Sequence, residues 1–104
     1  MDRIAHLLEI LAANPDDTFA RYALGMEYSR AGRVDDAVSE FRTLTDKQPD
    51  YANAYFMAAQ ALAGVDRVPE AKSLLQEGVA AANRARNQHA ASEMQAMLDE
   101  LEFR

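Results

Sequence analysis

The chain has 104 residues, 49% of them hydrophobic, which is enough for one domain and too short for two ordinary ones. Its formal net charge of −6 argues against binding to nucleic acid, whose phosphates attract clustered Lys and Arg, and against an anionic membrane surface. The absence of cysteine excludes disulfides and thiolate metal sites, while the few Gly, Pro and β-branched residues favour an all-α fold.

The first predicted helix covers residues 2–13. Its apolar residues recur at helical spacing: Ile4, Leu7, Leu8 and Leu11. Asp2 lies near its start, where a negative charge interacts favourably with the helix dipole. Glu9 interrupts the apolar stripe and no basic segment precedes the stripe, so we do not expect this helix to be a signal peptide. No apolar run is long enough to span a bilayer, and we therefore expect a soluble, cytoplasmic protein.

Residues 18–49 predict a helix, a tight turn and a second helix folded back on the first. The apolar faces that must meet contain Leu24, Gly25 and Tyr28 in the first segment, and Ala37 and Phe41 in the second. Gly32 lies between them, where a turn needs a residue that tolerates positive φ, and Pro49 ends the second segment. We expect helices over residues 17–31, with Asp16 or Asp17 as N-cap, and 34–47.

The same pattern recurs 34 residues further along the chain, as Asn14-Pro15-Asp16 precedes Gln48-Pro49-Asp50 by that interval. Further matching pairs are Ala20 and Ala54, Tyr22 and Phe56, Arg33 and Arg67, and Ala37 and Ala71. The second unit departs from the first: Tyr55 stands at the position of Arg21, Ala58-Ala59 replaces Leu24-Gly25, and Leu75 replaces Phe41. We expect the packing volume to be redistributed, with the fifth helix extending to about Arg84.

A last helix is predicted over residues 88–103. One of its faces is apolar and contains Ala91, Met94, Leu98 and Leu101, and the rest of the helix carries the acidic residues Glu93, Asp99, Glu100 and Glu102. In the 34-residue register its key positions are filled by His89, Ser92, Glu93 and Ala96, a poor match. We therefore expect a capping helix with its apolar face turned inward.

The spacing L-G-x2-Y, A-x3-F and P in residues 24–49 closely resembles the tetratricopeptide repeat, a helix-turn-helix unit of 34 residues. The departure is Arg21, where that family usually has Trp. The resemblance implies an α-solenoid of antiparallel helix pairs with about six helices. Its units are an N-terminal half-repeat (1–14), a first repeat (18–51), a second repeat (52–85) and a C-terminal capping helix (87–104).

The resemblance also implies a concave groove that receives partner peptides. Its positions in this sequence are Phe19, Tyr22, Met26, Ser29 and Arg30 in the first repeat, and Asn53, Phe56, Gln60, Ala63 and Gly64 in the second. We take Phe19, Tyr22, Met26, Arg30, Asn53, Phe56 and Gln60 as the candidate binding residues. Phe19, Tyr22, Met26 and Phe56 are apolar residues that the repeat scaffold does not require for its own packing.

The expected partner is an apolar or amphipathic protein segment. A subclass of the family binds acidic C-terminal tails through Lys and Asn, but Tyr22 and Met26 occupy the positions of that clamp. One alternative stays open: the terminal helices fold over the groove, and Phe19 packs against the first helix.

Candidate catalytic residues are nearly absent. The sequence has no phosphate-binding glycine loop, no HExxH and no nucleophile elbow. His6 and His89 lie in opposite terminal helices, and the paired carboxylates suit helix starts or an exposed face. We therefore expect a non-catalytic protein-interaction module without cofactor or metal. The alternative is homo-oligomerisation through the exposed ends of the repeat stack.

Overall fold

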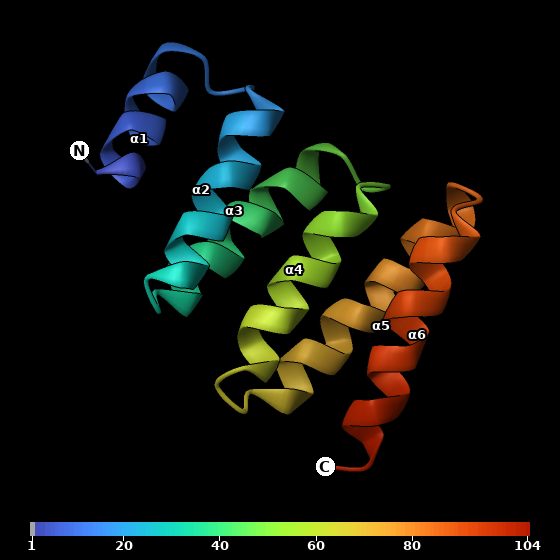
Figure 1. The fold of residues 1–104 in the computed structure, drawn as a ribbon. Helices are drawn as coiled ribbons and strands as arrows, with labels where there is room; N and C mark the ends of the chain where they lie inside the picture. Colours follow the sequence, from blue (N-terminus) through green and yellow to red (C-terminus); the bar gives the residue numbers. More distant parts are fainter. Residues whose placement is uncertain (1) are drawn as a thin grey trace.

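The structure, a computed structural model, describes residues 2–104, and none of these residues forms a strand. Six helices follow one another: α1 (Arg3–Ala13), α2 (Thr18–Arg30), α3 (Val34–Lys47), α4 (Ala52–Ala63), α5 (Val68–Arg84) and α6 (Gln88–Glu102). Figure 1 shows successive helices running back and forth along an elongated molecule, with the two termini at opposite ends. The predicted all-α fold is confirmed.

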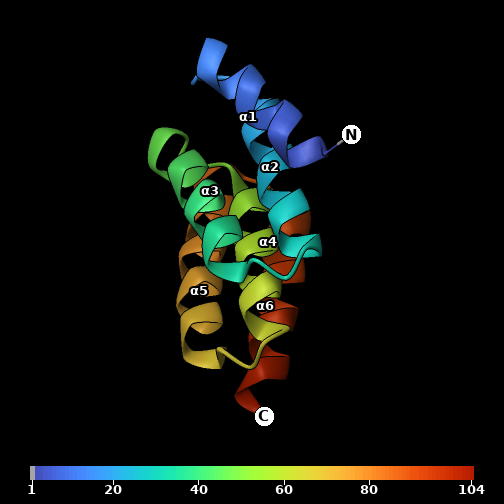
Figure 2. The ribbon, with the colours of Figure 1, turned by 90° about the vertical axis from the view of Figure 1, so that its left-hand side faces the viewer.

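The helices form two layers, with α2, α4 and α6 in one and α3 and α5 in the other (Figure 2). Each helix packs against its neighbours in the chain, and α4 also contacts both α2 and α6. The result is an α-solenoid of 40 × 29 × 18 Å. Among the described helices, α1 packs against α2 alone.

Side-chain caps begin three of the helices. Asp2 accepts a hydrogen bond from the backbone N–H of Ile4 at 3.0 Å, and Asp17 accepts one from Ala20 at 2.9 Å. Asn87 starts α6 in the same way, accepting from Ala90 at 3.1 Å. Each cap satisfies a backbone donor that has no partner within its helix. Of the two predicted N-caps for α2, Asp17 is the one used.

Three helices end in the same turn. A residue with positive φ follows α2, α4 and α5: Gly32 (φ 77°), Asp66 (φ 60°) and Arg86 (φ 57°). In each turn the next residue donates a backbone hydrogen bond to the carbonyl five positions earlier: Arg33 to Tyr28, Arg67 to Leu62, and Asn87 to Ala82, at 2.8–3.0 Å. This is the Schellman arrangement, which satisfies the free carbonyls of a helix end. The prediction for Gly32 is confirmed.

The core of the first repeat depends on a close approach between α2 and α3. Leu24, Gly25, Tyr28, Ala37 and Phe41 are all buried, as the spacing predicted. A Cβ on Gly25 would lie 2.7 Å from Cζ of Phe41, closer than two carbon atoms can pack. Gly25 is therefore required by the ring that lies against it.

The second repeat has its close approach at a different position. A Cβ on Gly78 of α5 would lie 2.8 Å from Cβ of Tyr55 and 2.5 Å from Sδ of Met94. The space around Gly78 is thus filled from α4 and α6 together. The sequence analysis did not single out this glycine, because its neighbours come from two other helices.

Helix α6 packs against α5 and α4 as α4 packs against α3 and α2. Its predicted inward residues Ala91, Met94, Leu98 and Leu101 are buried. The N-cap of α6, Asn87, follows the N-cap of α4, Tyr51, by 36 residues, because α5 has 17 residues where α3 has 14 and the loop after α5 is one residue shorter than the loop after α3. The mismatch with the 34-residue register therefore results from a lengthened α5.

Candidate partner-binding groove

Four of the seven candidate residues lie together on one face of α2. Phe19, Tyr22 and Met26 follow one another at the spacing that places side chains on one helix face, and Arg30 continues the row. They line a shallow hollow of about 270 Å³ together with Ala23, Glu27 and Arg3 of α1. We call this hollow the α2 groove.

The other three candidate residues lie on α4. Asn53 and Phe56 line a small separate hollow of about 10 Å³, whose other wall comes from Ala90, Glu93 and Met94 of α6. Gln60 is exposed and lines neither hollow. Because α4 lies beside α2 in the same layer of helices (Figures 1 and 2), all seven residues belong to that layer, but they do not line one continuous pocket.

The apolar candidates differ greatly in exposure. Phe19 is 83% exposed, so the alternative in which it packs against the first helix is wrong. Tyr22 is half-buried: its ring stacks on Tyr51 with centroids 5.9 Å apart and meets Phe41 edge-on at 5.7 Å. The expectation that the scaffold does not need Tyr22 is therefore corrected. Met26 and Phe56 also pack partly against the core.

Burial changes the acidity of the two stacked tyrosines. It raises the pKa of the Tyr22 hydroxyl, with a smaller contribution from the neighbouring Tyr51, and it raises the pKa of Tyr51 as well. Burial has this effect because a phenolate loses more hydration than a phenol. Both rings therefore stay neutral at physiological pH, and the Tyr22 ring gives the α2 groove an uncharged part of its lining.

A cluster of charges lies at the far end of the α2 groove from Phe19. Glu27, whose side chain is only 15% exposed, pairs with Arg3 of α1 through Nε and Oε1, 3.4 Å apart, and also with Arg30. The side chains of Arg3 and Arg30 are 69% and 67% exposed. The sequence analysis missed Arg3 and Glu27. Arg30 lies three residues after Glu27, so the ion pair between them could have been predicted from the sequence. The contact of Arg3 with Glu27 could not, because it depends on how α1 packs against α2.

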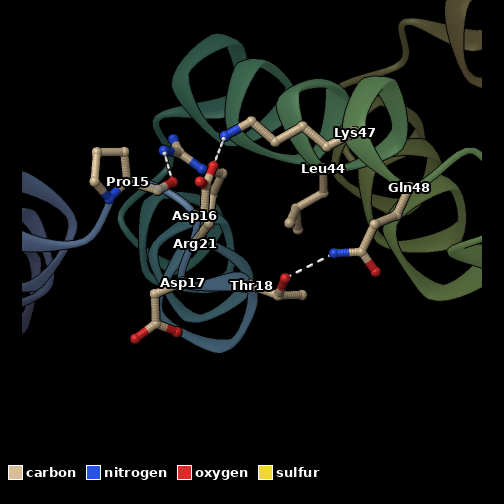
Figure 3. A pocket seen from close by; sticks show the side chains of 8 residues that line it. All are labelled: Pro15, Asp16, Asp17, Thr18, Arg21, Leu44, Lys47 and Gln48. Carbon is tan, nitrogen blue, oxygen red and sulfur yellow. Dashed lines mark hydrogen bonds and ion pairs between the residues drawn. The ribbon is translucent and has the colours of Figure 1, made fainter.

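A further hollow, of about 220 Å³, lies where the loop before α2 meets the end of α3 (Figure 3). Its polar groups pair with one another: Lys47 with Asp16 at 2.7 Å, Gln48 with Thr18 at 2.7 Å, and Arg21 with the Pro15 carbonyl at 2.9 Å. The hydrogen bond from Lys47 lowers the pKa of Asp16. Because these polar groups already form hydrogen bonds with one another, the hollow joins α2 to α3 structurally and does not offer free groups to a ligand.

Neither histidine belongs to a candidate metal site. His6 lies on α1, and His89 on α6 lies 3.0 Å from a carboxylate oxygen of Glu93. Across residues 2–104, no three His, Asp or Glu side chains converge in a group that could hold a metal ion. In that same part of the chain, every helix is too short or too polar to cross a membrane.

Comparison with known proteins agrees with this architecture. A sequence model of the tetratricopeptide repeat matches residues 28–98, more than half of the chain. The chain therefore belongs to the tetratricopeptide repeat family. Members of this family are typically non-catalytic and bind other proteins, and the chain is a protein-interaction module of this general kind. No curated protein matches it.

Two solved structures are similar over most of their length. The solution structure of protein BPP2914 from Bordetella parapertussis has a TM-score of 0.82 and 26% identity, and the match covers 98% of this chain and 89% of that one. A tetratricopeptide repeat domain protein from Salinibacter ruber, also determined in solution, has a TM-score of 0.77 and 28% identity, with 86% and 90% covered. The first match covers nearly the whole of this chain, whereas the second leaves part of it unmatched.

Proposed function

We propose that this chain is a cytoplasmic, non-catalytic adaptor that holds a peptide or helical segment of another protein against the layer formed by α2 and α4. The binding residues are Phe19, Tyr22, Met26, Arg30, Asn53, Phe56 and Gln60. The observation that supports this most is Phe19, which is 83% exposed beside a hollow. A phenylalanine in that position contributes almost nothing to folding, but it offers a partner a large apolar surface.

The rest of the α2 groove is suited to receive an apolar side chain. Tyr22 is held by Tyr51 and Phe41, so its ring already occupies one orientation before a partner arrives. Binding to a side chain that is already ordered loses less conformational entropy than binding to a mobile one. Phe19 and Met26, on either side of Tyr22, then supply the contacts that a partner would complete.

The test is an affinity capture from lysate of the source cell with three forms of the domain: wild type, Phe19→Ala and Phe103→Ala. Phe103 is the matched control, because it is 90% exposed and lies at the opposite end of the molecule. We expect a partner that the wild type and Phe103→Ala retain and Phe19→Ala loses. Equal capture by all three forms would show that the α2 groove is not the functional surface.

Homo-oligomerisation through the ends of the stack is the second candidate, favoured by a different observation. Among the described helices, α1 packs against α2 alone and leaves Leu8 46% exposed, and Phe103, which follows α6 at the other end of the stack, is also exposed. Sedimentation at increasing protein concentration separates the two candidates. A groove-binding adaptor stays monomeric, whereas self-assembly gives a mass that rises with concentration and falls again on Leu8→Gln.

A further inference from the structure

Resting on the proposed function, we infer that the α2 groove selects an amphipathic segment of another protein that carries an acidic side chain beside its apolar anchors. The feature that points to this is the cluster of Arg3, Glu27 and Arg30. Two guanidinium groups face one carboxylate there, so the lining of the groove has one uncompensated positive charge. This local charge is opposite to the net charge of −6 of the whole chain.

Stability alone requires no more than one of these arginines. Glu27 and Arg30 form an i,i+3 pair within α2, and Arg3 joins α1 to the same carboxylate. Ion pairs of exposed arginines contribute little to stability, and a single guanidinium neutralises Glu27. The second arginine is therefore free to pair with a carboxylate that comes from outside.

The two guanidinium groups are also well placed to accept that carboxylate. Each contacts Glu27 and keeps about two-thirds of its side-chain surface open to solvent. A guanidinium has five N–H donors in a rigid plane, so donors remain for a second, bidentate partner. Contact with Glu27 restrains both arginines before binding, which reduces the entropy lost when the complex forms.

The position of the cluster predicts the pattern of the partner. Phe19 and Arg30 lie at opposite ends of the α2 face, roughly 16 Å apart at the helical rise per residue. An apolar anchor near Phe19 therefore pairs with an acidic residue about ten positions away in a helical partner, or about five in an extended one. Charges more than about 8 Å away are largely screened at physiological ionic strength, so the charged residues that line the groove act most strongly on a bound segment.

The test is a selection of displayed random 16-residue peptides on four forms of the domain: wild type, Phe19→Ala, the double variant Arg3→Gln, Arg30→Gln, and a matched control. The control is Arg42→Gln, Arg84→Gln, because these two arginines are also exposed and ion-paired but lie on α3 and α5 in the other layer. We expect wild type and control to enrich apolar peptides containing Asp or Glu. The groove double variant should lose the acidic preference.

One selected peptide is then synthesised with a twin in which Asp or Glu is replaced by Asn or Gln, and both are titrated by fluorescence anisotropy. We expect the neutral twin to bind wild type about tenfold more weakly, because a charge-assisted bidentate contact is lost. The two peptides should bind the Arg3→Gln, Arg30→Gln variant equally. High salt should narrow the difference seen with wild type.

The outcomes separate this inference from the function on which it rests. Peptides that depend on Phe19 but bind as well in the neutral form would overturn the acidic preference and leave the adaptor proposal in place. If wild type enriches no peptide relative to Phe19→Ala, both fail. A dimer of the free domain that Arg3→Gln, Arg30→Gln dissociates would also overturn the inference, since the occupant would then be a second copy.

Discussion

In the first repeat, Gly25 of α2 leaves room for the ring of Phe41 from α3, whereas the second repeat has Ala59 and Leu75 at the corresponding positions. In the second repeat the glycine is on the other helix of the pair: Gly78 of α5, where the first repeat has Leu44. The two units therefore fill similar volumes with large and small side chains exchanged between positions. A repeat pattern therefore constrains the total side-chain volume at an interface more than it constrains the residue at each position.

The position that is usually Trp in this family shows the same tolerance. Arg21 donates a hydrogen bond to the carbonyl of Pro15 at 2.9 Å, and Tyr55 donates one to the carbonyl of Pro49, also at 2.9 Å. Arg21 additionally pairs with Glu40 at 2.7 Å, with both side chains largely buried. Although one side chain is charged and the other aromatic, both attach the helix to the preceding loop. What this position requires is therefore a side chain that is long enough to reach the preceding loop and that carries a hydrogen-bond donor. Its chemical type matters less.

The largest expected effect comes from enlarging Gly25. Gly25→Leu should destabilise the domain by about 1–3 kcal/mol, because even a Cβ at this position collides with the buried ring of Phe41. Chemical denaturation followed by circular dichroism measures the change. An unchanged unfolding midpoint would show that the register of the two helices is wrong.

A double variant that gives the first repeat the residue pair of the second tests whether Gly25 and Phe41 share one packing site. Gly25→Ala with Phe41→Leu recreates the combination found at Ala59 and Leu75. The double variant should lose less stability than the two single variants added together, because the smaller side chain at position 41 removes the collision. Strict additivity would mean that the two residues do not share a packing site.

Gly78→Ala should cost about 1–2 kcal/mol, because Cβ of Tyr55 lies 2.8 Å from the new methyl group and α4 must shift to make room. The cost should be less than that of Gly25→Leu, because alanine adds a single carbon and the thioether of Met94 is flexible enough to move away. Gly64→Ala is the matched control. Gly64 has an ordinary φ of −64°, and a Cβ there meets nothing closer than 3.4 Å. Thermal unfolding should show a loss for the first variant and no loss for the second.

The two aromatic residues of the α2 groove should respond differently to truncation. Tyr22→Ala should destabilise the domain by about 1–2 kcal/mol, because it removes contacts with Tyr51 and Phe41. Phe19→Ala should stay within about 0.5 kcal/mol of wild type, since the side chain is exposed. Denaturant midpoints compare the two. A large loss for Phe19→Ala would place that residue in the core and remove the main support for the adaptor proposal.

Substitutions at two of the helix-ending turns should change stability by smaller amounts and in opposite directions. Arg86→Gly should stabilise the domain by about 0.5–1 kcal/mol, because a glycine adopts a φ of 57° without strain. Gly32→Ala should destabilise it by about 1 kcal/mol for the same reason in reverse. Differential scanning calorimetry of both variants checks the pair. Changes of the same sign would contradict the assignment of a shared turn.

The smallest expected effect is on the stability of the domain at acidic pH. Hydrogen bonds from Lys47 and Arg67 lower the pKa of Asp16 and of Glu70 in the folded state. The folded domain then binds fewer protons than the unfolded chain, so these pairs stabilise it above pH of about 4, and the contribution is lost as the pH falls. Both side chains are largely exposed, so the difference should be slight. Asp16→Asn with Glu70→Gln should slightly flatten the fall in stability between about pH 5 and 2.

The sequence alone determined the number and type of the helices, the 34-residue register and the turn at Gly32. These features depend on residues a few positions apart, and their spacing is visible in the chain itself. It also selected the row of Phe19, Tyr22 and Met26 on one face of α2. The confirmed helix boundaries, α5 ending at Arg84 among them, follow from the same local signals.

Only the tertiary structure decided which of these side chains remain free for a partner. Tyr22 is half-buried because Tyr51 and Phe41 come to it from the end of the repeat and from the other layer, and Gly78 is required because α4 and α6 meet over it. Arg3 reaches Glu27 only because α1 folds back along α2. Burial and charge pairing depend on segments far apart in the chain, and the spacing of residues within one helix does not determine how those segments pack together.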